Sequence, residues 1–286
     1  MHLASFYQLV DQALQEDIGD GDHSTLACIS ATSRGRAVLK IKDQGVLAGM
    51  EVAEKIFQYK DPSVQFKKYK NDGDVMHPGE IAFEVESFVT VILQCERLVL
   101  NCMQRMSGIA TLTHQYAEKL KGYHTKLLDT RKTTHNFRLL EKEAVRIGGG
   151  INHRFGLYDM IMLKDNHIDF CGGIESAIER AWDYVQTKKP ELKIEVETRT
   201  LDDVKKVIHT GKGKVFRIML DNFNPTQLEE AVQLIRTEGG FETEASGGIN
   251  LENIRSYAAT GVDFVSVGAL IHQAKSVDLS LKASIL

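Results

Sequence analysis

The second half of the chain alternates short apolar segments with amphipathic helices, and this alternation limits the possible folds more than any other feature. After about residue 125, six runs of apolar or β-branched residues are each followed by a stretch with helical periodicity. Repeated pairs of strand and helix are typical of parallel βαβ units. The predicted strands cover residues 125–129, 159–165, 193–197, 216–221, 242–246 and 263–268.

The spacing of these strands favours a barrel. Residues 197, 221, 246 and 268 end successive strands at intervals of 24, 25 and 22 residues, which fits one strand, one helix and two loops. A complete TIM barrel contains eight such units. With six strands visible, we expect an α/β protein with an open, incomplete TIM-like barrel over residues 111–286. A doubly wound sheet is the alternative architecture.

The preceding residues predict a different domain. Helical periodicity covers about residues 3–17, and alternating runs at 36–43, 44–50 and 81–87 predict antiparallel strands. The IGDGD sequence between helix and strands predicts a turn. A long helix is expected over residues 90–121 and links the two parts of the chain. The sequence therefore predicts an N-terminal α+β sandwich domain with its linking helix over residues 1–110.

The composition excludes several classes of protein. A net charge of -4 argues against a nucleic-acid binder. No apolar run approaches the roughly 20 residues of a membrane helix, and the N-terminal residues lack the basic start of a signal peptide. We therefore expect a cytoplasmic protein without nucleic-acid or membrane partners.

The four cysteines predict neither a zinc site nor a nucleophile. They form no CxxC pair and no zinc-type cluster with histidines. Cys95 and Cys102 lie seven residues apart in the linking helix and so share one face. In a reducing compartment all four, including Cys28 and Cys171, are interpreted as small core residues.

A basic block interrupts this acidic chain. Six lysine or arginine residues and only two acidic residues lie between Arg131 and Arg154. Such a local excess of positive charge indicates an anionic ligand. Guanidinium forks and ammonium groups suit a dicarboxylate or a phosphate, and histidines can donate hydrogen bonds to the same oxygens. Each side chain alone is more often a solvated surface residue. The candidates are Arg131, Lys132, His153, Arg154, Lys164 and His167.

Polar residues or glycines follow every predicted barrel strand. The carboxyl ends of parallel strands meet at one face, where ligands bind. A polar residue after a single strand is more often a helix cap or a turn, so the interpretation depends on the convergence of all six ends. These ends are residues 129–132, 164–167, Glu197, 221–222, 246–248 and Gly268.

Two features of this face suggest how a phosphorylated sugar could bind. Glu197 and Asp221 could hold Mg²⁺ through bound pyrophosphate, or could face positive charge developing on the sugar. Glu195 points to the same side, deeper in the barrel, and we favour Glu197 over it. Glycine loops after the last two strands favour a phosphate site, with tight turns as the alternative. Residues 148–150 precede a strand, so they fit a flexible connector as well as a ligand loop.

The order of these motifs resembles quinolinate phosphoribosyltransferase. DTRKTTHNFRLLEKEAVRIGGGINHRFGLYDMIMLKDNH is followed by EVE, IMLDNF, EASGGI and SVGAL, while EDIGDGDHST and ERLVLNCMQRMSGIAT lie upstream. The resemblance covers nearly the whole chain and implies a sandwich domain with an open barrel. It also implies that quinolinate and phosphoribosyl pyrophosphate give nicotinate mononucleotide, pyrophosphate and CO₂, with Mg²⁺, in de novo NAD biosynthesis.

By position, the resemblance divides the polar residues between two substrates. It implies that the quinolinate carboxylates are surrounded by Arg131, His153, Arg154 and Lys164. Phosphoribosyl pyrophosphate and its metal would be served by Lys132, Glu197 and Asp221, the expected catalytic residues, together with His167, Ser246, Gly247, Gly248, Val267, Gly268 and Ala269. Arg97 would reach the quinolinate site of the partner subunit, which implies a homodimer. From the sequence alone Arg97 is a surface residue of the linking helix.

One departure from the family pattern and three alternatives remain. The family usually reads TRKTTPGLR, whereas His135, Asn136 and Phe137 replace Pro-Gly-Leu here, so we expect a loop of different stiffness. A related barrel protein encoded with molybdenum transport genes would act on another substrate. A Schiff-base aldolase would use Lys164, and a non-catalytic protein could keep the fold without the reaction.

Overall fold

The computed structural model describes residues 3–285, which fold into two compact units. The first unit combines the chain up to His114 with Thr133–Gly149 and the segment from Leu270 onward. The second combines Gln115–Lys132 with Gly150–Ala269. Each unit therefore joins segments far apart in the sequence. The domain boundary expected after residue 110 stays a prediction, because the first compact unit also contains Thr133–Gly149 and the segment from Leu270 onward.

An antiparallel sheet is the framework of the first unit. Its strand order is β12-β1-β5-β3, and alternate residues of β1 are buried, so the period-two pattern of the sequence marks the core face. Met50 begins a helix within the predicted strand at 44–50, while the helix at 3–17 and the strands at 36–43 and 81–87 are confirmed. The elements are α1 (Leu3–Ile18), α2 (His23–Cys28), β1 (Arg34–Ile41), β2 (Gly45–Val46), α3 (Met50–Lys60), β3 (Gln65–Lys68), β4 (Val75–Met76), β5 (Ile81–Phe88), α5 (Arg138–Ile147) and β12 (Leu279–Ile285).

The linking helix predicted over residues 90–121 is confirmed as α4 (Val89–Lys119). Although it has 31 residues, neither α4 nor any other helix within residues 3–285 has the apolar character needed to span a membrane. Gly108 is buried in this helix, and a Cβ atom there would lie 2.0 Å from the carbonyl oxygen of Lys275. The C-terminal segment thus crosses α4 at a position where only glycine fits.

Replacing Gly108 with alanine should lower the free energy of unfolding by roughly 1–3 kcal/mol, because the added methyl group must displace backbone atoms. Urea denaturation followed by circular dichroism measures this change. Asn101→Ala, at an exposed position of the same helix, is the matched control and should stay within about 0.5 kcal/mol of the wild type. An equally small effect at Gly108 would contradict the close approach.

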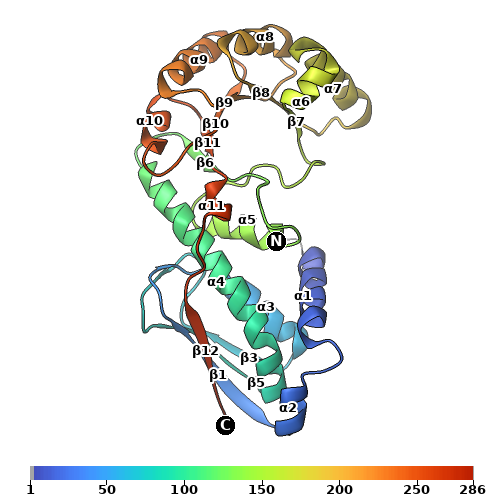
Figure 1. Cartoon of the computed structure of the whole chain (residues 1–286), viewed down its shortest axis with the longest axis vertical. Helices are drawn as coiled ribbons and strands as arrows, with labels where there is room; N and C mark the ends of the chain where they lie inside the picture. The colour runs from blue at the N-terminus through green and yellow to red at the C-terminus, as the bar shows by residue number, and fades with distance from the viewer. Residues whose placement is uncertain (1–2, 286) are drawn as a thin grey trace. The chain divides into compact units, whose positions relative to one another are not determined.

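Six parallel strands form the second unit, in the order β6-β11-β10-β9-β8-β7. From β7 to β11 each strand pairs with the next along the chain, so the alternative of a doubly wound sheet, whose order reverses, is wrong. Within the described residues β6 and β7 are not paired with each other, so the barrel is open as predicted. Figure 1 shows α7 to α10 as an arc outside the strands. The elements are β6 (Lys126–Leu128), β7 (Ile161–Leu163), α6 (Asp165–Cys171), α7 (Ile174–Lys188), β8 (Ile194–Thr198), α8 (Leu201–Gly211), β9 (Arg217–Asp221), α9 (Pro225–Glu238), β10 (Glu242–Ser246), α10 (Ile254–Ala259) and β11 (Phe264–Ser266). The last residue of this unit begins α11 (Ala269–His272), which otherwise belongs to the first unit.

The interpretation of all four cysteines as core residues is only half right. Cys95 and Cys102 are buried on α4, and burial raises the pKa of both thiols to about 12, which makes them inert. Cys28 is exposed because it ends the short helix α2, whose only buried residue is Thr25. Cys171 is half-buried at the end of α6, a helix without any buried residue.

Two of the three glycines at 148–150 have a structural role in the first unit. Gly148 caps α5, and a Cβ atom on it would lie 2.5 Å from the carbonyl oxygen of Ala110 in α4. Gly149 has a φ of 97°, which suits glycine and turns the chain away from the helix. These contacts account for two of the three glycines without a ligand.

Candidate active site

The carboxyl ends of the barrel strands bring most of the predicted site residues to one edge of the second unit. Ser246 at the end of β10 is in register with Asp221 at the end of β9. Lys164 follows β7 directly, and Glu197 is the fourth residue of the neighbouring strand β8. Arg97 lies in the first unit, exposed on α4, which agrees with its description as a surface residue.

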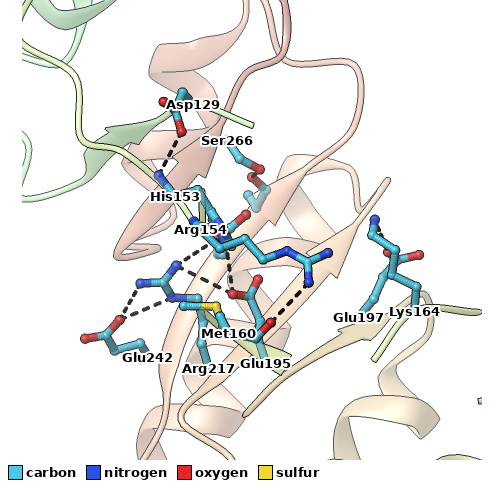
Figure 2. A network of polar contacts seen from close by, with 12 residues as sticks. Asp129, His153, Arg154, Met160, Lys164, Glu195, Glu197, Arg217, Glu242 and Ser266 are labelled. Atoms are coloured by element: carbon cyan, nitrogen blue, oxygen red, sulfur yellow. Dashed lines mark hydrogen bonds and ion pairs between the residues drawn. The ribbon is translucent and has the colours of Figure 1, made fainter. Parts of the chain in front are cut away.

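A cluster of charged side chains is buried in the barrel, one step deeper than this edge (Figure 2). All five residues of β8 are buried, and Glu195, two residues before Glu197, joins Glu244 and Arg217 inside the barrel. Nη1 of Arg217 lies 2.9 Å from Oε2 of Glu244 and 3.7 Å from Oε2 of Glu195. Both carboxylates are fully buried. Burial and the adjacent charge of Glu244 raise the pKa of Glu195.

His153 completes this cluster. Its side chain is only 5% exposed, and Nε2 lies 3.0 Å from Oε2 of Glu195 and 3.2 Å from Oε2 of Glu244. Its backbone N–H donates to Oδ1 of the buried Asp129 (2.8 Å). Burial alone would lower the pKa of His153, but the hydrogen bonds to the two glutamates outweigh it and raise the pKa to about 9. Nε2 of His153 therefore points into the barrel, toward the two glutamates.

The charge state of His153 follows from a comparison of two effects. The amide N–H of Arg154 donates to Nδ1 of His153 (2.7 Å), a bond that a doubly protonated ring gives up. Losing one hydrogen bond costs about 1 kcal/mol, whereas a buried charge without its partner costs roughly 3–5 kcal/mol. Arg217 also contacts Glu242 (2.7 Å), so its charge is shared among several carboxylates, and we assign an imidazolium that adds a second cation to the cluster.

This assignment predicts how stability depends on pH. Because the pKa of His153 is about 9 in the folded protein and about 6.5 in an unfolded chain, its contribution is full below pH 6.5 and is lost as the pH rises through about 9. The difference in unfolding free energy between the wild type and His153→Gln should shrink across this window. Urea denaturation at a series of pH values measures it. A difference that does not change with pH would contradict the imidazolium.

Arg131 and Arg154 form a pair of neighbouring guanidinium groups. Burial and the charge of Arg131 lower the pKa of Arg154, whose Nη1 donates to the carbonyl oxygen of Met160 (3.2 Å). The buried Nε of Arg131 has no hydrogen-bond partner among the described residues. Like charges and a buried donor without an acceptor are both unfavourable. An anion with several acceptor oxygens would relieve both.

A second group of charges lies at the ends of β7, β8 and β9. Nζ of Lys164 is 3.0 Å from Oε2 of Glu197. The guanidinium of Arg199 reaches the other oxygen of Glu197 (3.3 Å), Oδ2 of Asp165 (2.8 Å) and, through Nε, Oδ2 of Asp221 (3.9 Å). The structure thus brings together the two acids predicted to serve the metal. It also places Lys164 beside one of them.

The remaining predicted residues have varied local roles. Lys132 is exposed, and its N–H donates to the hydroxyl of Thr130. His167 accepts the N–H of Lys164 at its Nδ1 (3.0 Å) and so caps α6. Asn136, in the loop that departs from the family pattern, has a φ of 64°. Asparagine tolerates this left-handed conformation, which glycine would also adopt.

The two glycine loops lie directly after β10 and β11. Gly247 has a φ of 93°, and a Cβ atom on it would lie 2.2 Å from Oδ1 of Asn222, so contact with the neighbouring strand end requires glycine there. Gly248 also has a positive φ, with open space around its Cα. The N–H of Val267 donates to the carbonyl oxygen of Leu128 and extends the pairing with β6. Ser246, Gly268 and Ala269 complete the two loops.

The arrangement of acids limits where a metal could bind. Within the described residues, the only close group of three ligand side chains is His153, Glu195 and Glu244. Arg217 and the imidazolium of His153 already face the two carboxylates of that group, and a protonated ring nitrogen cannot bind a metal, so it is a poor metal site. Glu197 and Asp221 offer two carboxylates, which is what Mg²⁺ uses when substrate phosphates supply its other ligands. The donor set at the strand ends therefore fits a metal that arrives with a diphosphate.

Sequence reasoning missed three charged residues of this region. Arg217 and Glu244 lie within predicted strands, where a charged residue usually marks a solvent-facing side. Arg199 directly follows the end of β8, so the rule that strand ends converge was a usable signal for it. Asp165 lies in the predicted strand end at 164–167, but no role was predicted for it.

Comparison with known proteins places the whole chain in one group. Residues 22–107 and 109–282 match the N-terminal and C-terminal domains of quinolinate phosphoribosyl transferase, respectively. The chain is 43% identical to a chloroplastic nicotinate-nucleotide pyrophosphorylase (carboxylating) of Arabidopsis thaliana, over 96% of this chain and 81% of that protein. It is 40% identical to a probable nicotinate-nucleotide pyrophosphorylase (carboxylating) of Bacillus subtilis, over 97% and 93%. The crystal structure of NadC from Streptococcus pyogenes superposes with a TM-score of 0.91 at 39% identity, covering 100% of this chain and 99% of that one.

Proposed function

This chain belongs to the quinolinate phosphoribosyltransferase family, and from that premise we propose that Arg131 and Arg154 bind the carboxylates of quinolinate. The single observation that carries this proposal is the guanidinium pair itself, with mutual repulsion and a buried Nε that lacks an acceptor. A dicarboxylate supplies two negative charges and several acceptor oxygens. Arginine binds such groups with two parallel hydrogen bonds.

The reaction transfers the phosphoribosyl group of phosphoribosyl pyrophosphate to quinolinate and removes one carboxylate, as in de novo NAD biosynthesis. The pyridine nitrogen bonds to C1 of the sugar as the bond from C1 to the pyrophosphate oxygen breaks. The ribosylated nitrogen is then cationic and takes up the electron pair of the carbon–carbon bond when CO₂ leaves. A proton from solvent replaces CO₂ on the ring carbon and gives nicotinate mononucleotide.

The residues of the site act mainly by positioning and charge. His153 is held by the buried glutamates and fixes the backbone from which Arg154 extends. Lys132 and Lys164 supply positive charge toward the anionic groups of the two substrates. Nζ of Lys164 is engaged in an ion pair with Glu197 (3.0 Å), which does not suit the Schiff-base aldolase alternative, where this nitrogen must attack a carbonyl carbon.

We assign the metal and phosphate contacts to the strand ends. Glu197 and Asp221 would hold Mg²⁺ together with the pyrophosphate oxygens, and the ion would neutralise the charge of the leaving group. The loops Ser246 to Gly248 and Val267 to Ala269 would hold the 5-phosphate, because their glycines leave the backbone accessible. His167 would contribute from the start of α6.

One assay tests the proposed function. Purified protein incubated with quinolinate, phosphoribosyl pyrophosphate and Mg²⁺ should form nicotinate mononucleotide and release CO₂ from the carboxyl group next to the ring nitrogen. Chelation of the metal with EDTA should abolish turnover, and added Mg²⁺ should restore it. Nicotinate in place of quinolinate tests whether the second carboxylate is required. Substrate binding without pyrophosphate release would favour the non-catalytic alternative, and inactivity with quinolinate would favour the barrel protein associated with molybdenum transport.

We also propose a cytoplasmic homodimer in which Arg97 serves the partner's site. Arg97 is exposed on α4, and the second unit exposes Leu157 and Tyr158 (72% each) and Phe170 (92%). Apolar side chains as exposed as these favour burial in an interface. Sedimentation should therefore report a dimer.

Shared sites predict complementation between two inactive variants. If Arg97 acts in the partner's site, mixing Arg97→Ala and Arg154→Ala protomers should produce mixed dimers in which one of the two sites is intact. Activity should recover to about a quarter of the wild type after random exchange of protomers, since half of the dimers are mixed. If the mixture is no more active than the two separate variants together, Arg97 acts in the site of its own chain.

A further inference from the structure

Arg199 contacts carboxylates from three neighbouring strand ends. Its Nη2 lies 2.8 Å from Oδ2 of Asp165 and 3.3 Å from Oε1 of Glu197, and its Nε lies 3.9 Å from Oδ2 of Asp221. These carboxylates come from the ends of β7, β8 and β9. Arg199 therefore supplies positive charge to both acids that we assign to the metal.

The charges around Arg199 leave room for one more cation. Three carboxylates face two protein cations, Arg199 and Lys164, so the group has a net charge of -1. A diphosphate is strongly anionic and would be repelled by it. A divalent cation changes the sign of the group to positive and makes it attractive to a diphosphate. The guanidinium of Arg199 and a metal ion would compete for the same oxygens of Glu197 and Asp221.

The backbone of Arg199 is fixed, whereas its side chain is half exposed. Its N–H donates to Oδ2 of Asp203 in the first turn of α8 (3.2 Å), beside the capping box formed by Thr200 and Asp203. The side chain is 54% exposed, with no ring stacked on it among the described residues. The pair of Arg199 with Asp165 is exposed on both sides (54% and 39%) and is therefore weak. By contrast, Glu197 and Asp221 are more buried (6% and 15%) and need a cation whenever the arginine leaves them.

We propose that Arg199 is a mobile substrate-binding residue: it neutralises Glu197 and Asp221 in the free enzyme, and it turns to a diphosphate oxygen when a divalent cation takes its place at these carboxylates. This inference rests on the proposed function, because the diphosphate is that of phosphoribosyl pyrophosphate. It adds a residue for which the sequence predicted no role. The guanidinium group can exchange a carboxylate for a phosphate, because both anions accept two parallel hydrogen bonds from arginine.

Two affinities distinguish this role from a purely structural ion pair. In Arg199→Ala no arginine competes with a metal ion for Glu197 and Asp221. This variant should therefore bind Mn²⁺ alone about tenfold more tightly than the wild type. The same variant should bind pyrophosphate in the presence of Mg²⁺ about tenfold more weakly. A structural ion pair would change neither affinity in this opposed manner.

Calorimetry on the full-length protein, with Mn²⁺ alone and with Mg²⁺ and pyrophosphate as probes, measures both affinities. Arg199→Lys keeps the charge and should fall between the wild type and Arg199→Ala in each. Arg180→Ala removes an exposed arginine from α7 and should behave like the wild type. Thermal unfolding of each variant should remain within about 2 °C of the wild type, because Arg199 is half exposed.

The result that overturns the inference is an unchanged or weaker Mn²⁺ affinity in Arg199→Ala, or an unchanged affinity for pyrophosphate with Mg²⁺. Failure of the proposed function gives a different result. In that case the wild type itself binds neither quinolinate nor pyrophosphate with Mg²⁺, and the inference falls with it. If the wild type binds both ligands and the Arg199 variants bind them with the same affinities, the proposed function stands and Arg199 is structural.

Discussion

Arg154→Ala should raise the KM for quinolinate by at least about a hundredfold. A charge-assisted hydrogen bond contributes roughly 1.5–3 kcal/mol, and a bidentate contact loses two of them, which corresponds to a factor of 100 or more. Arg154 is half-buried beside Arg131, and its Nη1 donates to the Met160 carbonyl, so the side chain is already oriented. Steady-state kinetics with quinolinate as the varied substrate measures the effect.

The controls for this prediction separate binding from general damage. Arg154→Lys keeps the charge but loses the fork, so it should recover only part of the loss. The affinity for pyrophosphate with Mg²⁺ should change less than about threefold in both variants, because we assign that ligand to Glu197, Asp221 and their neighbours. Arg131→Ala should weaken quinolinate binding in the same way. Unchanged kinetics in both Arg131→Ala and Arg154→Ala would exclude this pair as the carboxylate site.

Arg217→Met should lower the free energy of unfolding by roughly 3–5 kcal/mol. Methionine has an unbranched side chain that fills part of the space of the arginine, but it carries no charge. Glu195 and Glu244 then stay buried with the His153 imidazolium as their one cation. The side chain of Arg217 is only 8% exposed, and its guanidinium also lies 4.2 Å from the ring centre of Phe264. Urea denaturation at neutral pH measures the loss.

A second substitution tests the cause of this loss. In Arg217→Met with Glu244→Gln, one buried carboxylate is replaced by a neutral amide, so the double variant should recover at least half of the lost stability. Arg180→Met, on the exposed side of α7, controls for the introduction of methionine. If the double variant is less stable than Arg217→Met, packing rather than charge balance explains the effect of Arg217.

The parts of the fold that follow from periodicity could be predicted, and those that depend on tertiary contacts could not. The six barrel strands, α1 and α4 were predicted because buried positions repeat at intervals that differ between strand and helix. The assignment of Glu197 to the strand end and of Glu195 to a deeper position followed from the alternation of side chains along β8. By contrast, the exposure of Cys28 depends on how little of α2 is buried.

The contacts within the site show the same division. The convergence of strand ends placed Lys164, Glu197 and Asp221 near one another without any coordinates. The partners of these residues depend on register and on side-chain direction, so the roles of Arg199 and Arg217 were not evident. The inward orientation of His153 was likewise missed, because a histidine next to an arginine gives no sign of the two glutamates opposite it. The substrate contacts of these residues stay predictions.

The pairing of β12 with β1 has a consequence for the order in which the protein forms during synthesis. Leu39 of β1 lies opposite Leu281 of β12, so this sheet needs residues that leave the ribosome about 240 positions later. The barrel strands, all between Lys126 and Ser266, are translated before β12. The nascent chain can thus complete the barrel while one edge of β1 still lacks its partner. An unpaired strand edge favours association with other chains, so slow translation of the final segment should increase aggregation more than slow translation within the barrel.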